Sequence, residues 1–314
     1  MGLAVLAQSV FAASLRYCDG AQSERTAAVQ DRLLQVAAIV KSELEKSHQA
    51  VALVARSGLA LQRFEQRYSH AGISLQDNPQ GRWAVRQLYF ACDEKKPRIF
   101  DQGMSGFVLG AQDPTEGYVS LLFLPSEAAQ LLQAAALDDA LALRLLGTTY
   151  SANAYAFDTR YQNCNQWVAE LLAMAWDDQT AADVGPALAA RDPGTLADPS
   201  PVIRTRTLAQ RWLADQGYEA TVFDLHWQPV LWLASAIPWL HLDDHPALDQ
   251  RAARLRVSMP SSIEAFVRSR FDTVQRVELC YSEQQVLIRR GWQPIDAGCV
   301  ARPGDEVVGL DERL

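Results

Sequence analysis

The sequence has no apolar run approaching the roughly 18 residues that a membrane-spanning helix needs, so no integral membrane span is expected. It also has no Gly-rich phosphate loop, Cys-x-x-Cys pair or His-Glu-x-x-His motif, which leaves nucleotide, redox-dithiol and zinc-protease functions without support. No Gly-x-Ser-x-Gly elbow is present to carry a serine nucleophile. Basic residues are in the minority, with 29 Lys and Arg against 37 Asp and Glu, so we expect no nucleic-acid or anionic-membrane partner.

The rest of the composition is that of an ordinary globular protein. Of the 314 residues, 49% are hydrophobic and 21% are charged, which is enough to form one or two substantial cores. Residues 1–14 are mainly apolar or small and end in Val-Phe-Ala-Ala-Ser, a sequence typical of a small-residue cleavage site. We interpret them as the end of a secretory signal peptide without the usual positively charged start. A short buried N-terminal helix is the alternative.

The use of cysteine agrees with export to an oxidising compartment. The five cysteines are Cys18, Cys92, Cys164, Cys280 and Cys299. If Cys164 is a free nucleophile, the other four can pair in three ways. We favour a Cys280–Cys299 disulfide because these residues flank one predicted hairpin, and this leaves Cys18 to pair with Cys92. The predicted location is therefore periplasmic or secreted, whereas in a reducing compartment all five would be thiols.

Residues 161–172 predict a helix that carries a cysteine in its first turn. Asn163 is a favourable N-cap, and apolar residues follow at the spacing of one helical face. The free backbone N–H groups and the dipole of the helix N-terminus favour a thiolate at Cys164, which makes this residue a candidate nucleophile. The alternative is a buried structural cysteine, since free cysteine is among the most buried residue types.

A histidine lies on a predicted hairpin far upstream of this helix. Residues 67–74 and 83–90 resemble two strands, and the segment between them is rich in Asp, Asn, Pro and Gly. A cysteine nucleophile needs a base, and a histidine held by a third polar group can serve as one. In the favoured register His70 faces Gln87, with Arg86 as the second choice of orienting residue. A shift of the register by one residue would reverse the face.

These motifs resemble a known superfamily. Ser-His-Ala-Gly-Ile at 69–73 and Asn-Cys-x-x-Trp-Val at 163–168 are similar to the circularly permuted papain-like (NlpC-like) proteins, which include relatives of lecithin–retinol acyltransferase. The resemblance implies a Cys-His-polar triad formed by Cys164, His70 and Gln87, with the histidine first in the chain. Gln87 departs from the commoner histidine or acidic residue at the third position. The resemblance also implies an antiparallel sheet packed against the cysteine-bearing helix.

Nearly the whole chain resembles a bacterial family described only as a domain of unknown function. The resemblance rests on residues 52–58, the surroundings of His70 and Cys164, and residues 239–246 and 288–292. This family implies no activity by itself, so the expectation of an enzyme comes from the wider superfamily alone.

The expected fold is α+β, with a permuted papain-like core over residues 15–180. Within it, the patterns predict a helix over 23–47, strands over 49–55 and 117–125, and a helical region over 126–147 that breaks near residues 138–139. Residues 181–203 are rich in Asp, Ala, Gly and Pro, which indicates a linker or a covering loop. Residues 204–314 then predict an α+β extension that packs on the core.

Two further segments have alternative interpretations. His241, Asp243, Asp244 and His245 could bind a metal, but prolines on both sides disfavour a helix. The expected role is to cap turns and form local hydrogen bonds, or, for His245, to line the cleft. The tryptophans of the preceding segment, Trp227, Trp232 and Trp239, form either core or a docking patch. We therefore predict no metal and no cofactor.

The function expected from these observations is an exported thiol hydrolase that cleaves an amide or ester bond. A cell-envelope peptide, lipid or protein is the expected substrate by analogy with the superfamily. The alternatives are a thiol acyltransferase that acts on lipids, and a catalytically inactive envelope module that binds a partner or assists assembly.

Overall fold

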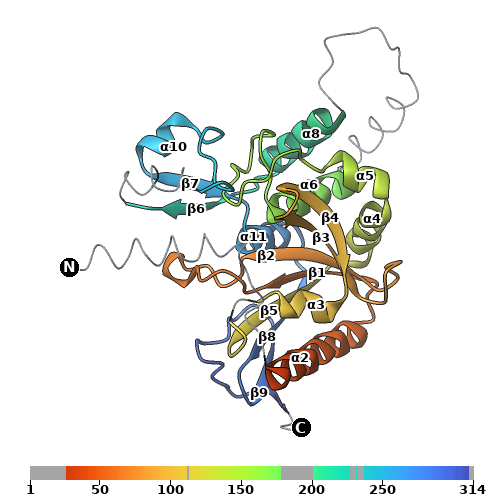
Figure 1. Ribbon diagram of the computed structural model, residues 1–314. Coiled ribbons are helices and arrows are strands. Elements are labelled where there is room, and N and C mark those ends of the chain that lie inside the picture. Colours follow the sequence, from red (N-terminus) through yellow and green to blue (C-terminus); the bar gives the residue numbers. More distant parts are fainter. Residues whose placement is uncertain (1–25, 112, 178–200, 227–230, 232–236, 311–314) are drawn as a thin grey trace, which may run out of the picture.

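The computed structural model describes residues 26–111, 113–177, 201–226, 231 and 237–310, and it contains one large sheet flanked by helices (Figure 1). The sheet has eight strands in the order β10-β9-β8-β5-β1-β2-β3-β4, and all neighbouring pairs are antiparallel. The strands are β1 (Val51–Arg56), β2 (His70–Leu75), β3 (Ala84–Ala91), β4 (Lys96–Gln102), β5 (Gly117–Phe123), β8 (Gln275–Tyr281), β9 (Gln285–Arg290) and β10 (Glu306–Gly309). The predicted α+β class with an antiparallel sheet is confirmed.

The two faces of the sheet are covered by different helices (Figure 1). Alternate side chains of a strand point to opposite faces, so on β1 Leu53 and Ala55 enter one core while Ala52 and Val54 enter the other. The helices that contribute to the first core are α4 (Ser126–Leu137), α5 (Asp139–Arg144), α6 (Cys164–Trp176), α8 (Pro201–Asp215) and α11 (Pro260–Arg270). Those that contribute to the second are α2 (Ala27–Lys46) and α3 (Met104–Leu109). The sheet is therefore the middle layer of three.

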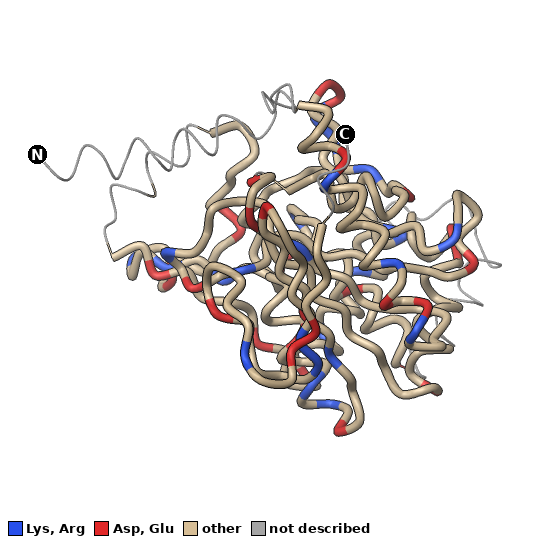
Figure 2. The backbone as a smooth tube through the Cα atoms, turned by 90° about the horizontal axis from the view of Figure 1, so that it is seen from below, with Lys and Arg blue, Asp and Glu red and all other residues tan. Residues whose placement is uncertain are grey.

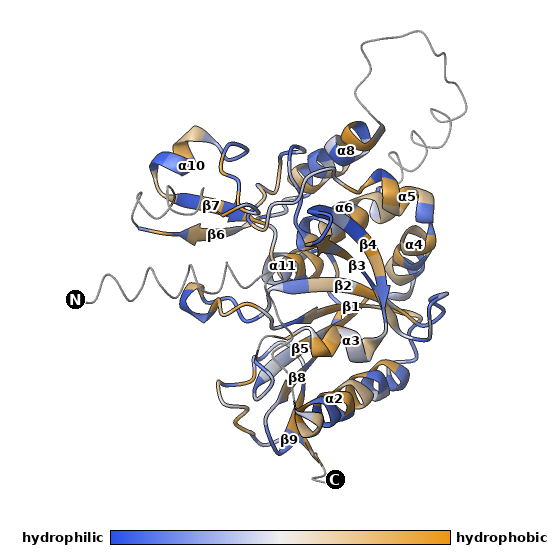
Figure 3. Cartoon of the chain, in the orientation of Figure 1, coloured by the Kyte–Doolittle hydropathy of each residue, from blue (hydrophilic) through white to orange (hydrophobic). Residues whose placement is uncertain are grey.

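The helix predicted over residues 23–47 is confirmed as α2 for residues 27–46, whereas residues 23–25 lie outside the described residues. The Thr26 side chain accepts a hydrogen bond from the Val29 N–H at 3.3 Å, and Leu33, Val40 and Leu44 are among its buried residues. Figure 3 shows hydrophobic and hydrophilic residues alternating along this helix, as expected for a surface helix that buries one side.

The C-terminal strands β8, β9 and β10 belong to the same sheet as the N-terminal strands. β8 pairs with β5 over its full length, from Gly117↔Tyr281 to Phe123↔Gln275. The segments predicted as core (15–180) and extension (204–314) therefore share one sheet. A smaller lobe contains β6 (Thr221–Asp224), α10 (Ala247–Arg251) and β7 (Arg254–Val257), and it has its own apolar cluster. Residues 1–14, and residues 181–200 of the predicted linker, lie outside the described residues.

The predicted Cys280–Cys299 disulfide is confirmed. It joins the end of β8 to the loop that follows β9, with the two Cα atoms 5.4 Å apart. Cys92 is also disulfide-bonded, whereas Cys18, its predicted partner, lies outside the described residues. In the part of the chain that the structure describes, no helix is both long and apolar enough to span a membrane.

Lysine and arginine residues are distributed among aspartate and glutamate residues along the chain (Figure 2). Several of them form ion pairs at the surface, such as Arg82 with Glu45 at 2.5 Å and Arg302 with Asp296 at 2.7 Å. Each of these ion pairs neutralises the positive charge of its arginine.

Candidate active site

The cysteine lies at the start of a helix, as predicted. Asn163 caps α6, and its side-chain oxygen accepts a hydrogen bond from the Gln166 N–H at 2.7 Å. All residues of the helix are buried, because it lies between the sheet and the neighbouring helices. Cys164 is the first helical residue, a free thiol with 7% of its surface exposed.

The histidine lies on the predicted hairpin, at the first residue of β2. Strand β2 pairs with β3 in the register Ile73↔Arg86, which brings Gly72 next to Gln87. Side chains two residues apart share a face, so His70 also lies on the Gln87 side of the sheet. The imidazole Nε2–H of His70 donates a hydrogen bond to Oε1 of Gln87. A side chain at position 72 would not fit here, since its Cβ would lie 2.5 Å from Val85 Cγ1 and 3.3 Å from the Gln87 Cβ.

Arg86, the second candidate for the orienting residue, points to the opposite face. Its guanidinium binds Asp101 and Asp139, each at 2.7 Å, together with the Ala136 carbonyl. It therefore makes no contact with His70 and anchors β3 to β4 and the α4–α5 junction. The structure brings together His70 and Gln87, but not His70 and Arg86.

A second glutamine on β4 continues the hydrogen-bond chain. Nε2 of Gln87 donates to Oε1 of Gln102 at 2.8 Å, which directs the Gln87 carbonyl oxygen toward the imidazole. A carbonyl acceptor at Nε2 requires the proton on that nitrogen, so Nδ1 of neutral His70 carries the basic lone pair. The sequence did not indicate Gln102, because the pattern of residues 98–104 fits either a loop or a short strand and so assigns no face to their side chains.

The thiol lies against the backbone of the residue that follows His70. The N–H groups of Ala71, Asn165 and Cys164 itself lie close enough to the sulfur to lower the pKa of the thiol. No hydrogen bond joins the Cys164 thiol and the His70 imidazole among the described residues. Helix α6 packs against β2, but it covers the face of the sheet on which Arg86 lies. The His70 ring lies on the other face, where its centroid is 5.9 Å from that of Phe107 on α3.

Burial sets both protonation states at this site. Removal from water raises the pKa of Cys164 from its ordinary value to about 11, although the positive charge of Arg56 and the nearby N–H groups oppose this change. Removal from water also lowers the pKa of His70 to about 3; the charge of Arg56, its cross-strand neighbour, adds to this effect, and the Gln87 hydrogen bond opposes it. Burial thus outweighs the helix N-terminus in setting the pKa of Cys164, and it favours the thiol over the thiolate expected from the sequence.

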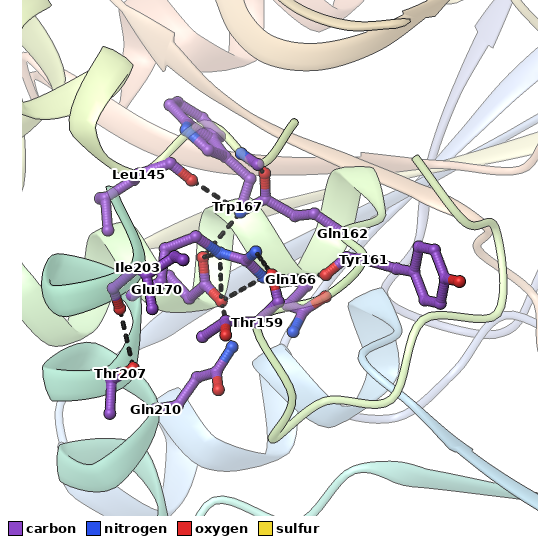
Figure 4. A network of polar contacts seen from close by, with 12 residues as sticks. Leu145, Thr159, Tyr161, Gln162, Gln166, Trp167, Glu170, Ile203, Thr207 and Gln210 are labelled. Atoms are coloured by element: carbon purple, nitrogen blue, oxygen red, sulfur yellow. Dashed lines mark hydrogen bonds and ion pairs between the residues drawn. The ribbon is translucent and has the colours of Figure 1, made fainter. Parts of the chain in front are cut away.

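A buried polar network holds the loop that enters the cysteine helix (Figure 4). The Glu170 carboxylate accepts hydrogen bonds from Gln162 at 2.6 Å and from Gln210 at 2.7 Å. Gln162 also donates to the Leu145 carbonyl and accepts from the Gly147 N–H, so it fixes both ends of residues 147–162. This network is independent of the hairpin and positions α6 from its other side.

The side chains of residues 241–245 form hydrogen bonds as expected, but not local ones, because their partners lie 82 to 92 residues away in the chain. His241 stacks on Tyr161 with ring centroids 4.1 Å apart, and Asp243 accepts a hydrogen bond from the Tyr161 hydroxyl at 2.9 Å. Asp244 accepts from the Tyr155 N–H at 2.7 Å, and His245 donates to the backbone carbonyl of residue 153 at 2.8 Å. Of the predicted aromatic segment, Trp239 packs against the main core, whereas Trp227 and Trp232 lie outside the described residues.

The fold and site define an α+β protein with a cysteine at a helix N-terminus and a glutamine-bound histidine on the adjoining sheet. The model of the family described as "Uncharacterized protein conserved in bacteria (DUF2145)" matches residues 43–267, and the chain belongs to this family. The match spans His70, Gln87 and Cys164, and it confirms the resemblance to a bacterial family of unknown function. No curated protein and no solved structure matches the chain.

Proposed function

We propose that this protein is an exported thiol hydrolase that cleaves an amide or ester bond, with Cys164 as nucleophile, His70 as base and Gln87 as orienting residue. The observation that carries the proposal is the hydrogen bond from His70 to Gln87. The residue after His70 on β2 is Ala71, and its backbone N–H lies next to the Cys164 sulfur. The permuted papain-like classification belongs to the same proposal. It is supported by the histidine-before-cysteine order and by the packing of the cysteine helix on an antiparallel sheet.

In this mechanism Cys164 Sγ attacks the carbonyl carbon while Nδ1 of His70 takes the thiol proton. The S–C bond forms, the carbonyl oxygen becomes an oxyanion, and the Cys164 backbone N–H helps to stabilise it. The imidazolium then gives its proton to the departing amine or alcohol as the C–N or C–O bond breaks. Water then attacks the thioester carbonyl while His70 takes its proton, the C–S bond breaks to release the acid, and the imidazolium returns the proton to the Cys164 sulfur.

The protonation states favour general-base catalysis over a preformed ion pair. With pKa values of about 11 for Cys164 and about 3 for His70, both groups are neutral at pH 7. The proton therefore moves during the attack and not before it. Gln87 supports this step, because its carbonyl oxygen accepts the Nε2–H bond from the imidazolium as well as from the neutral ring.

A cell-envelope peptide or a related amide is the proposed substrate, and the periplasm or the exterior is the proposed location. The disulfides at Cys92 and at Cys280–Cys299 support export, since such bonds persist in oxidising compartments. The substrate class rests on analogy with the papain-like superfamily.

Covalent capture tests the proposal. The purified protein is incubated with p-nitrophenyl acetate, quenched in acid and analysed by intact and peptide mass spectrometry, beside Cys164→Ala and His70→Ala variants. We expect one acetyl group on Cys164 of the unaltered protein, none in Cys164→Ala, and slower acetylation in His70→Ala by a factor of about 100 or more. Absence of acetylation in the folded protein, or equal rates with and without His70, contradicts the proposal.

The second candidate function is a non-catalytic envelope module, and the burial of Cys164 favours it. A thiol that is 7% exposed with a raised pKa is also what an inert core cysteine shows. Under this function Cys164→Ala leaves the folded protein and its partner binding unchanged, and the unaltered protein is not acetylated.

A further inference from the structure

We propose that Asn165 is a positioning residue that sets the separation between Cys164 and His70. The inference rests on the proposed function, because it assigns a role within the same site. Neither the sequence motifs nor the predicted triad pointed to this residue.

The side chain of Asn165 binds the backbone on both sides of His70. Its Oδ1 accepts a hydrogen bond from the Ala71 N–H at 2.9 Å, and its Nδ2 donates to the Ser69 carbonyl at 3.2 Å. The partners are a backbone donor and a backbone acceptor, so the orientation of the amide is fixed by chemistry. One side chain on the residue after Cys164 thus brackets the backbone of His70.

Asn165 binds the Ala71 N–H and the Ser69 carbonyl at a position where β3 does not pair with β2. Pairing between β2 and β3 begins at Ile73↔Arg86, whereas residues 69–71 lie before it. On the other side, β1 pairs with the strand as far as Arg56↔His70. Asn165 therefore replaces a missing neighbouring strand at the position where the histidine is attached, and it is 2% exposed, so water does not compete for these hydrogen bonds.

The geometric consequence falls on proton transfer. Cys164 and Asn165 are consecutive residues in the first turn of α6, so the hydrogen bonds from Asn165 tie the backbone of His70 to the helical turn that carries the sulfur. Proton transfer requires a donor and acceptor within about 2.6–3.2 Å of each other, and a misplacement of about 1 Å can cost a factor of about 100. The Ala71 N–H, which also lies near the sulfur, is held in place by the same bond.

Gln166, the next residue, provides a matched control. It is 1% exposed, and its Nε2 donates to the carbonyls of Tyr155, Ala156 and Asp158 at 3.1, 3.3 and 3.2 Å. Gln166→Ala thus removes buried side-chain-to-backbone hydrogen bonds from the same helical turn. None of these bonds reaches β2. A decrease in the alkylation rate that both variants share therefore reflects lower stability and not a loss of positioning.

A double-mutant cycle tests the inference through the rate of Cys164 alkylation by iodoacetamide at pH 7, mapped by peptide mass spectrometry. The effect of His70→Ala is measured in the unaltered protein, in Asn165→Ala and in Gln166→Ala. We expect His70→Ala to slow alkylation by a factor of about 100 in the unaltered protein and in Gln166→Ala. In Asn165→Ala we expect its effect to fall below about threefold, because the imidazole is no longer held within reach of the thiol.

The outcomes separate this inference from the proposed function. If His70→Ala slows alkylation equally in the unaltered protein and in Asn165→Ala, Asn165 has no positioning role and the inference is wrong. If His70→Ala has no effect in the unaltered protein, the proposed function itself fails. If Asn165→Ala does not fold, Asn165→Asp takes its place under the same criterion, because a carboxylate oxygen repels the Ser69 carbonyl and breaks the bracket.

Discussion

Glu170 and Arg206 form an ion pair inside the molecule, with side chains that are 0% and 1% exposed. Arg206 donates from Nε and Nη2 to the carboxylate at 2.9 and 3.0 Å, and from Nη1 and Nη2 to the carbonyls of Thr159 and Tyr161. The pair therefore joins α6 and α8 to the loop that leads into the cysteine helix. The sequence did not indicate it, because its members lie on two helices that the predicted linker separates in the chain.

Removal of one partner of this pair should be costly. We expect Arg206→Met to lower the free energy of unfolding by about 3–5 kcal/mol, because the Glu170 charge stays buried without its cation. Urea denaturation measures the loss. As a control, Arg302→Met breaks the surface pair with Asp296, in which both side chains are about half exposed, and should cost below about 1 kcal/mol. Equal losses in the two variants would show that the buried pair has no special role.

The hydrogen bond between His70 and position 87 should control the histidine pKa. In Gln87→Glu a carboxylate replaces the amide, so we expect the pKa of His70 to rise from about 3 by about 1–3 units through charge pairing. An NMR titration of the imidazole measures this change. Gln87→Met, which has a similar length but no hydrogen-bond acceptor of this kind, should give no rise. A His70 titration that is the same in Gln87→Glu and in the unaltered protein contradicts the assigned contact.

The lowered pKa of His70 also links folding to pH. The folded protein resists protonation of this ring down to about pH 3, while the unfolded chain takes up the proton near pH 6.5. The contribution of His70 to stability is therefore full above pH 6.5 and is lost as the pH falls toward 3, at up to about 1.4 kcal/mol per pH unit. Urea denaturation of the unaltered protein and of His70→Phe should show this difference. A difference between the two proteins that does not change with pH contradicts the burial of a neutral imidazole.

The Cys280–Cys299 disulfide should stabilise the folded protein because it lowers the conformational entropy of the unfolded chain. It closes a loop with a sequence separation of 19, for which chain entropy predicts a contribution of about 3 kcal/mol. We expect the double variant Cys280→Ala/Cys299→Ala to lose about this amount in urea denaturation. Cys164→Ala serves as the comparison that removes a thiol without opening a bridge. A double variant as stable as the unaltered protein would be inconsistent with this contribution.

Local patterns were sufficient to predict the elements that form the site. The cap at Asn163 and the apolar spacing after it predicted α6, and the polar turn between two apolar runs predicted the hairpin that brings Gln87 to His70. The same patterns placed the helix break at Asp138, whose side chain caps α5. In each case the residues that determine the structure are close together in the chain.

Features that depend on distant pairing could not be predicted in this way. Strands β8 and β5 lie about 160 residues apart in the chain, and nothing in either segment specifies the other as its partner. The pKa of Cys164 depends on how completely the neighbouring elements exclude water, which the helix pattern does not contain. The bracket formed by Asn165 likewise requires the position of β2 relative to α6.

The central claim is that Cys164 is activated by His70 as a general base, and the pH profile of acetylation by p-nitrophenyl acetate tests it most directly. With pKa values of about 3 and about 11 at the site, the unaltered protein should react at a nearly constant rate from about pH 5 to about pH 9. In His70→Ala only the thiolate reacts, so the rate should be far lower at neutral pH and rise about tenfold per pH unit. A tenfold rise per pH unit in the unaltered protein, or identical profiles for the two proteins, would contradict the account.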